Sequence, residues 1–300
     1  MMFVFIVNPA SGNGKSLSMW LRIEKKLQEQ KIPYKVLISI SEVATGKFFR
    51  TLQQSSHIKA VAVIGGDGTM SSIIQVLANT RIPIAVFPAG SGNDTARMFR
   101  LTNDPEQFLL GMLDNRMTSI DLLEINGRFG ITVAGTGIDS MIGNRVNHSF
   151  YKPILSKLGV GSLAYIIAAA LSAISFKSFN GSITIDGDKQ KLNNAWLIAC
   201  GNTTSYGGGL TICPQALPTD GILNITMFHD LKRIKAISRI FPTLLRGKPI
   251  LKKGITYKEG KEIIIETDRP ISAIVDGEIT TTTPLHITVH KKALQLLLTT

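Results

Sequence analysis

The sequence predicts an α/β domain followed by a mostly β-structured domain, on three observations. Up to about Leu122, short apolar runs alternate with segments of helical periodicity, which is typical of βαβ crossovers and a parallel sheet. Beyond it, short apolar runs are separated by the turn pairs Asn126–Gly127, Asp186–Gly187 and Asp276–Gly277, which are typical of antiparallel hairpins. The chain has 300 residues, of which 44% are hydrophobic, so it is long enough to fill two cores.

The first domain is predicted to contain four strands separated by helices. One helix is expected to run from Ser16, as its cap, to about Gln30. A second is expected around Gly46–Gln53, and a third opens at Thr69. The strands are predicted from four apolar runs: Met2–Val7, Tyr34–Ile38, Lys59–Ile64 and Ile82–Phe87.

The second domain is predicted to contain short strands and one unusual helix. Leu158–Phe176 has no charged residue, but its glycines and serines dilute its apolar character. We therefore expect a helix that is buried or lines a cleft, and a cleft-lining helix could contact a lipid chain. A transmembrane span is disfavoured by the same residues. The predicted strands are Ser182–Asp186, Ala195–Cys200, Leu223–Met227, Glu262–Thr267, Ser272–Val275 and Leu285–Val289.

A glycine-rich turn follows three of the predicted strands, at Asn8–Ser16, Gly65–Thr69 and Pro88–Arg97. Parallel strands end at the same edge of a sheet, so we expect the three turns to lie together there and to bind a nucleotide. Glycines let the backbone approach a bound group, and the start of a helix offers N–H donors to an anion. Asp67 would repel phosphate in such a turn unless it meets a metal ion or accepts a proton from an attacking hydroxyl. The turns therefore predict a phosphoryl-transfer site.

These turns resemble the motifs of one known family. NPASGNGK, GGDGT and PAGSGNDTAR are similar to the motifs of the diacylglycerol kinase catalytic-domain family, which includes bacterial soluble lipid kinases and sphingosine kinases. The resemblance continues in Gly207–Pro214, Thr219–Gly221 and Val275–Glu278, and so spans almost the whole chain in the right order. The GGDGT segment alone is not specific, because NAD kinases share it.

The resemblance implies a two-domain fold. It implies an N-terminal Rossmann-like parallel α/β domain at residues 1–122 and a mostly antiparallel β-sandwich-like domain at residues 123–287. Residues 288–300 would form a segment that returns toward the first domain. The active site would lie in the cleft between the two domains.

The resemblance implies an ATP-dependent lipid kinase. The expected reaction transfers the γ-phosphoryl group of ATP to a lipid hydroxyl, with diacylglycerol as the acceptor and phosphatidic acid as the product. Two alternatives stay open: an enzyme resembling NAD kinase, and a catalytically weak protein that binds nucleotide or lipid and regulates another process. Ser71 and Ser72 stand where NAD kinases use an asparagine–glutamate pair, which weighs against NAD as acceptor.

The resemblance also assigns roles to particular residues. Glu278 would accept the proton, and Asp67 would assist it or hold Mg²⁺ together with Asp94 and Asp121. A structural Mg²⁺ would be bound by the Asp220 side chain and the carbonyls of Leu217 and Ile222, with an acidic turn without metal as the alternative. The expected contacts with ATP are Asn8, Pro9, Ala10, Ser11, Gly12, Ser41, Gly66, Asp67, Gly68, Thr69, Met70, Ser71, Ser72 and Ser91.

The charge of the chain predicts an acidic partner. The formal net charge is +12, and Leu231–Lys253 contains eight basic residues and no acidic one, so it could form a basic amphipathic helix on an anionic membrane or a packed helix with a solvated face. With the resemblance, the partner is expected to be a lipid in an anionic membrane and not a nucleic acid, while a homodimer stays open. Cys200 and Cys213 fit a reducing compartment, and we expect no signal peptide. The expected location is the cytoplasm, with reversible binding to the inner membrane face.

Overall fold

The chain divides into two compact units. The computed structural model describes residues 2–39, 41–53, 58–149, 155, 162–231 and 253–299. Unit 1 comprises Met1–Asp121 and Lys291–Thr300, and unit 2 comprises Leu122–His290. The chain passes from one unit to the other twice, along the strands β5 (Met117–Ile125) and β17 (Leu285–Leu297).

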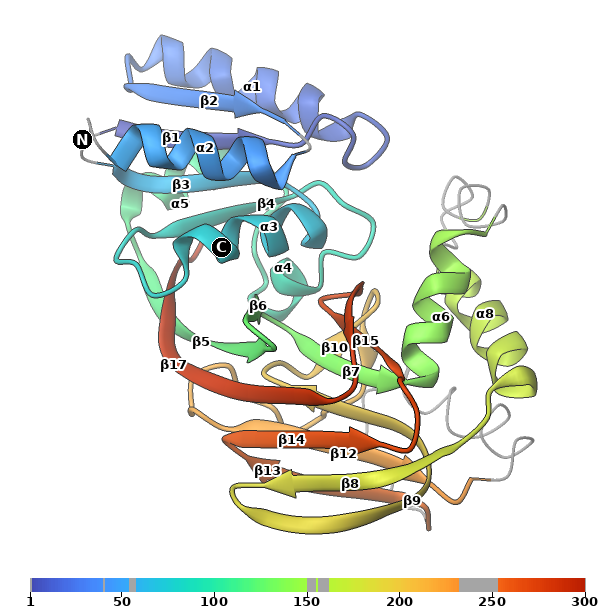
Figure 1. Ribbon diagram of the computed structural model, residues 1–300. Coiled ribbons are helices and arrows are strands. Elements are labelled where there is room, and N and C mark those ends of the chain that lie inside the picture. The colour runs from blue at the N-terminus through green and yellow to red at the C-terminus, as the bar shows by residue number, and fades with distance from the viewer. Residues whose placement is uncertain are drawn as a thin grey trace. The chain divides into compact units, whose positions relative to one another are not determined.

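Unit 1 is built on a parallel sheet whose strands lie in the order β2-β1-β3-β4-β17 (Figure 1). Every residue from Phe3 to Val7 in β1 is buried, so helices cover both faces of the sheet. Helix α1 packs beside α5, and α2 packs beside α3. The strands are β1 (Met2–Val7), β2 (Tyr34–Ile38), β3 (Ile58–Gly65) and β4 (Ile84–Pro88), and the helices are α1 (Lys15–Glu29), α2 (Glu42–Gln53), α3 (Asp67–Leu77), α4 (Asp94–Met98) and α5 (Pro105–Asp114).

The predicted elements of the first half are confirmed, with corrections at the helix starts. Helix α3 begins at Asp67, directly after Gly66, and not at Thr69. Ser16 is not the cap of α1: Gly14, in the left-handed conformation, precedes the helix, and Ser16 Oγ donates to the backbone carbonyls of Asn8 and Ser11. Helix α2 begins at Glu42, four residues earlier than predicted, because Ser41 Oγ accepts from the N–H of Ala44 and caps it.

Unit 2 is mostly antiparallel, as the sequence predicts. Its strands lie in the order β16-β15-β7-β9-β8-β14-β17, and β12 pairs with β9 and with β13. The shorter strands are β6 (Arg128–Gly130), β7 (Val133–Gly137), β10 (Ser205–Tyr206), β11 (Leu210–Thr211), β15 (Ser272–Val275) and β16 (Glu278–Thr282). The longer ones are β8 (Phe179–Ile185), β9 (Asp188–Gly201), β12 (Leu223–His229), β13 (Ile255–Gly260) and β14 (Glu262–Thr267).

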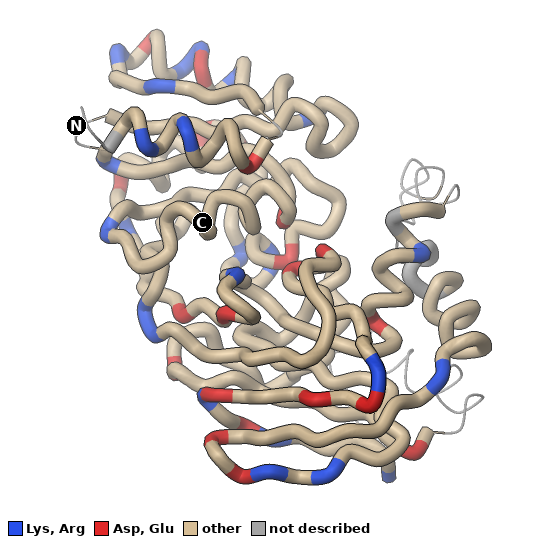
Figure 2. Tube along the Cα trace, in the orientation of Figure 1, with Lys and Arg blue, Asp and Glu red and all other residues tan. Residues whose placement is uncertain are grey.

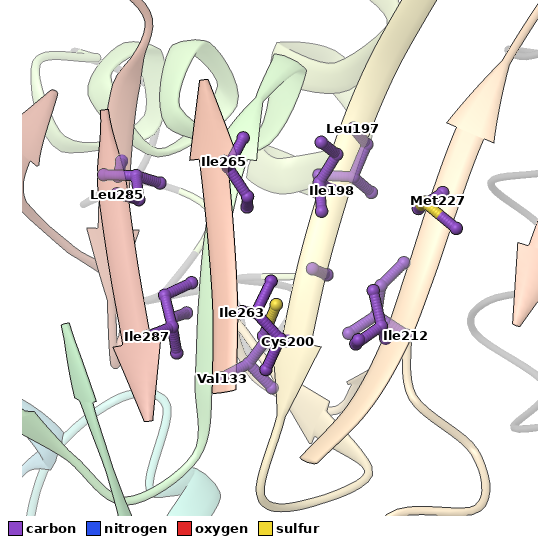
Figure 3. Close-up of a cluster of buried hydrophobic side chains, with 14 of the residues drawn as sticks. Val133, Leu197, Ile198, Cys200, Ile212, Met227, Ile263, Ile265, Leu285 and Ile287 are labelled. Carbon is purple, nitrogen blue, oxygen red and sulfur yellow. The ribbon is translucent and has the colours of Figure 1, made fainter. Parts of the chain in front are cut away.

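Side chains from neighbouring strands fill the core of unit 2 (Figure 3). Ile263 and Ile265 of β14 lie on the same side as Leu285 and Ile287 of β17, as the period of two along a strand requires. Each of these four side chains is at most 1% exposed. The antiparallel pairs therefore bury one continuous apolar layer.

Two helices of unit 2, α6 (Ile138–Asn147) and α8 (Ser162–Ser175), pack against each other. Helix α8 lies within the uncharged segment Leu158–Phe176, and Ala168, Ala169 and Ala173 on it are buried. No helix of the described residues is long and apolar enough to cross a membrane. Most of the basic segment Leu231–Lys253 lies outside the described residues, so its predicted helix stays a prediction.

Candidate active site

Three glycine loops of unit 1 lie together at one edge of its sheet. The strands β1, β3 and β4 are parallel neighbours, so the loops that follow them leave the sheet at the same edge. Asn8 Nδ2 donates to Thr69 Oγ1 (2.9 Å), which ties the first loop to the first turn of α3. Asn8 Oδ1 in turn accepts from the N–H of Ala10 (3.0 Å). This confirms that the three motifs converge.

Glycines allow these loops to approach one another. A Cβ on Gly90 would lie only 2.6 Å from Cα of Gly66, so the second and third loops touch backbone to backbone. Gly12 adopts a φ of +59°, and a Cβ there would lie 2.2 Å from the carbonyl oxygen of Ala89. Any larger residue at Gly12 or Gly90 would push the loops apart. The edge is thus lined by backbone, which suits close approach of a phosphate chain.

Two carboxylates flank the same glycine of the third loop. A Cβ on Gly92 would lie 2.7 Å from Oδ2 of Asp67 and 3.7 Å from Oδ2 of Asp94. The N–H of Thr95 donates to Asp67 Oδ1 (3.4 Å), while Asp94 pairs with Arg97 (3.0 Å) and is 6% exposed. The structure therefore brings Asp67 and Asp94 to one place, and Asp67 can lie so close to residue 92 only because Gly92 has no side chain.

Asp121, the third carboxylate predicted for this site, lies in β5 and is buried. Its Oδ1 accepts from the N–H of Lys292 (2.7 Å), which joins β5 to β17. Among the described residues, no group of three or more histidine, cysteine, aspartate or glutamate residues has the geometry to hold a metal ion. The structure thus groups Asp67 with Asp94 and gives Asp121 a backbone partner.

The other predicted ATP contacts differ in exposure. Met70 and Ser71 are each 1% exposed, which leaves mainly their backbone to contact a ligand. Ser72 Oγ donates to the carbonyl of Gly68 (3.2 Å), one turn earlier in α3. Ser91 is exposed, and Ser41 is the exposed cap of α2.

In unit 2, Asp276 and Gly277 form the turn of the β15–β16 hairpin, with φ of +51° and +85°. The Asp276 carboxylate accepts from the N–H groups of Ile131 (3.0 Å) and Thr132 (2.7 Å) and from Oγ1 of Thr132 (2.7 Å). Asp276 therefore anchors this hairpin to the segment between β6 and β7.

Glu278 begins β16, two residues after that anchor. Its side chain is 49% exposed, and Oε2 lies 3.9 Å from Nη2 of Arg128. Because the hairpin is anchored through Asp276, the backbone at Glu278 is fixed while its carboxylate reaches solvent.

Asp220 lies in an exposed turn and closes it with its own side chain. The N–H of Ile222 donates to Oδ1 of Asp220 (2.9 Å), and Asp220 is exposed. The Leu217 side chain is 55% exposed, so it does not anchor this turn in the core.

One carboxyl group of interest was missed at the sequence level. Asp139, in the first turn of α6, is 4% exposed, and burial raises its pKa to about 7. The N–H of Ser140 (2.8 Å) and the hydroxyl of Tyr206 (3.4 Å) donate to it. A Cβ on Gly135 would lie 1.8 Å from Asp139 Oδ2. In the sequence, Asp139 could have been found from the run Gly135–Asp139, which ends a strand and begins a helix.

Comparisons with known proteins agree with these features. Residues 2–125 match the model of the diacylglycerol kinase catalytic domain, and residues 132–298 match that of the YegS C-terminal NAD kinase beta sandwich-like domain. The chain is 31% identical over 298 residues to a diacylglycerol kinase of Mycobacterium tuberculosis, covering 97% of this chain and 93% of that protein. A solved diacylglycerol kinase structure from Bacillus anthracis str. Sterne superimposes with a TM-score of 0.71 at 19% identity, over 99% of this chain and 96% of that chain.

Proposed function

We propose, since this chain belongs to the diacylglycerol kinase family of lipid kinases, that it transfers the γ-phosphoryl group of ATP to the hydroxyl of diacylglycerol. The observation that carries the proposal is the meeting of three glycine loops around Asp67 and Asp94. Phosphoryl transfer needs donors around the phosphates and carboxylates near the transferred group, and this edge offers both.

ATP is proposed to bind along this edge. Its phosphates would lie against the backbone of Asn8–Gly12 and Gly66–Ser72, with Ser91 on the third loop. The close approaches at Gly12 and Gly90 support this, because they leave backbone rather than side chains along this edge.

The residues present fit a bound Mg²⁺. Asp67 and Asp94 supply carboxylate oxygens, the ligand type that Mg²⁺ prefers, and both lie against Gly92, which puts no side chain beside them. When bound, Mg²⁺ would neutralise charge on the phosphates of ATP. Asp121 would contribute by fixing the strand that carries it, through its bond to Lys292.

Glu278 is proposed to accept the proton of the lipid hydroxyl, with Asp67 assisting. The half-exposed carboxylate on an anchored hairpin suits this role, because a base must reach its substrate from a fixed backbone. Asp67 belongs to unit 1 and Glu278 to unit 2.

Asp220 is proposed to bind a second, structural Mg²⁺ together with the carbonyls of Leu217 and Ile222. An Asp220→Ala variant should need more Mg²⁺ for half-maximal activity, by about three-fold or more, because it loses a hard oxygen ligand. Magnesium titrations of both enzymes measure this. An unchanged titration would leave Asp220 with a purely structural role in its turn.

The direct test is a radiolabelled ATP assay over mixed micelles that contain diacylglycerol, monoacylglycerol, phosphatidylglycerol, ceramide or sphingosine, with NAD as a further acceptor. We expect label in phosphatidic acid. Label in NADP would support the alternative of an NAD kinase, and label in no product would support a regulatory binding protein. The predicted cytoplasmic location at the inner membrane face is compatible with each lipid acceptor.

A further inference from the structure

Helix α8 presents a stripe of large apolar side chains to solvent. Ile167, Leu171 and Ile174 follow one another at spacings of four and three residues, so they lie on one side of the helix. Their exposed fractions are 41%, 45% and 62%. We call these three residues the α8 stripe.

The opposite side of α8 is buried where the structure describes its side chains, from residue 167 onward. Ala168, Ser172 and Ala173 are at most 3% exposed, and α8 packs on α6. Figure 2 draws α8 without any charged residue along its length. The stripe is therefore the outer face of a firmly packed helix, and its side chains have no charged neighbours on the helix.

Basic side chains lie at the C-terminal end of this helix. Lys177 follows it and is exposed, and Arg145 of α6 donates from Nη2 to Oγ of Ser175 (2.9 Å). Arg269 donates from Nη2 to the carbonyl of Lys177 (2.8 Å), and it also pairs with Asp268 at 3.5 Å. A hollow of about 420 Å³ lies here, lined in part by Lys177 and Arg269.

We propose that α8 is a membrane-docking helix: the α8 stripe enters the acyl region of an anionic lipid surface, and Lys177, Arg145 and Arg269 contact the headgroup phosphates. An apolar face beside basic side chains is the pattern of helices that lie flat in a membrane interface. The inference rests on the proposed function, since it names the surface on which the lipid kinase meets its substrate.

Charge complementarity favours a lipid surface over a second copy of the chain. A two-fold contact through α8 would bring α8 against its own copy. Because α8 contains no acidic residue, it would offer no partner to the copy's Lys177. An anionic bilayer satisfies both the stripe and the basic side chains.

Vesicle sedimentation of the full chain tests the proposal. The triple variant Ile167→Gln, Leu171→Gln, Ile174→Gln should bind vesicles of phosphatidylglycerol and phosphatidylcholine at least about ten-fold more weakly than the wild type. The matched control is Leu21→Gln with Leu110→Gln, which removes exposed leucines of unit 1 (56% and 63% exposed) and should stay within about two-fold of the wild type. Equal loss in both variants, or in neither, would overturn the proposal.

A second variant reports insertion directly. The chain has two tryptophans, Trp20 and Trp196, which are 1% and 6% exposed. A tryptophan placed by Ile174→Trp should be quenched by brominated lipids in anionic vesicles, whereas one placed by Leu110→Trp should not. Equal quenching at both positions would also overturn the proposal, as would a triple variant that dissociates a dimer in the absence of lipid.

The enzymatic readout separates this proposal from the proposed function. The triple variant should keep its rate on a short-chain diacylglycerol dispersed in water and lose at least about ten-fold on vesicles. If the wild type phosphorylates no lipid, the proposed function fails, while the vesicle binding measurements still decide the role of α8.

Discussion

Carboxylates of the two units differ in their surroundings. In unit 1, Asp67 and Asp94 lie against Gly92, where Asp67 accepts from the N–H of Thr95 (3.4 Å) and Asp94 pairs with Arg97 (3.0 Å). In unit 2, the Asp276 carboxylate accepts three hydrogen bonds from Ile131 and Thr132. The carboxyl group of Asp139 is buried, which raises its pKa to about 7.

This difference bears on the roles proposed for these carboxylates. The three hydrogen bonds of Asp276 hold its hairpin and contribute to stability, whereas Asp67 and Asp94 lie among the glycine loops that are proposed to bind ATP. Variants in unit 1 should therefore change activity more than stability, and variants at Asp276 and Asp139 should do the reverse.

The largest expected effect is the pH dependence that Asp139 imposes on stability. Its pKa is about 7 in the folded chain and 3.8 as an unperturbed group, so the folded state keeps a proton that the unfolded state releases. The stabilisation is complete below about pH 4 and is lost as the pH rises to about 7, at about 1.4 kcal/mol per pH unit. An Asp139→Asn variant should lack this slope. Urea unfolding of both proteins between pH 4 and 8 measures it, and parallel curves would contradict the assignment.

Next in size is the loss of turnover at the proposed catalytic carboxylates. Asp67→Asn and Glu278→Gln should each lower turnover at least ~10²-fold, because each removes a group proposed to handle the proton or the metal. Their free energies of unfolding should stay within about 0.5 kcal/mol of the wild type. Steady-state assays with denaturation of the same samples compare the two effects. Near wild-type rates in both variants would remove these residues from the reaction.

Asp276→Asn should have the opposite profile. In this variant an amide NH₂ replaces one of the two carboxylate oxygens, and the backbone N–H that donates to that oxygen loses its acceptor. The free energy of unfolding should therefore fall by about 2 kcal/mol. Glu278→Gln, two residues away in the same hairpin, is the matched control and should unfold like the wild type. Thermal unfolding distinguishes them, and equal stability of the two variants would show that Asp276 is not an anchor.

The smallest effect is expected from a single methyl group. Gly92→Ala places a Cβ 2.7 Å from Asp67 Oδ2, which must move, so turnover should fall about ten-fold while stability changes by less than about 1 kcal/mol. Gly143→Ala is the control, because a Cβ there meets no atom within 4 Å. Unchanged turnover in Gly92→Ala would mean that turnover does not depend on the position of the Asp67 carboxylate.

Local chemistry predicted much of this fold. Glycine-containing turn pairs at Asn126, Asp186 and Asp276 all adopt positive φ, as two-residue hairpins require. The strands Glu262–Thr267 and Ser272–Val275 are confirmed to the residue. Helix α5 was missed although Asp104, followed by a proline, caps it by accepting from the next two free N–H groups.

What local patterns could not predict depends on distant partners. Serine is a common helix cap, but the hydroxyl of Ser16 donates to the carbonyls of Asn8 and Ser11 instead of capping α1. Strand β9 extends back to Asp188 because its polar half pairs with β8 across a hairpin, although that half has no apolar pattern. The donors to Asp276 lie 144 and 145 residues away in sequence. The position of the glycine loops was therefore predictable from the sequence, whereas the hydrogen-bond partners of each carboxylate were not.

The second passage of the chain between the units has a consequence for synthesis. Leu294, Leu296 and Leu297 of β17 are fully buried in unit 1, where Leu296 pairs in register with Ile84 of β4. Synthesis of unit 1 therefore begins before that of unit 2 and is completed after it. Until residues 291–300 emerge, β4 is an open sheet edge. A nascent chain thus carries all three glycine loops on an unfinished sheet while unit 2 is still being made.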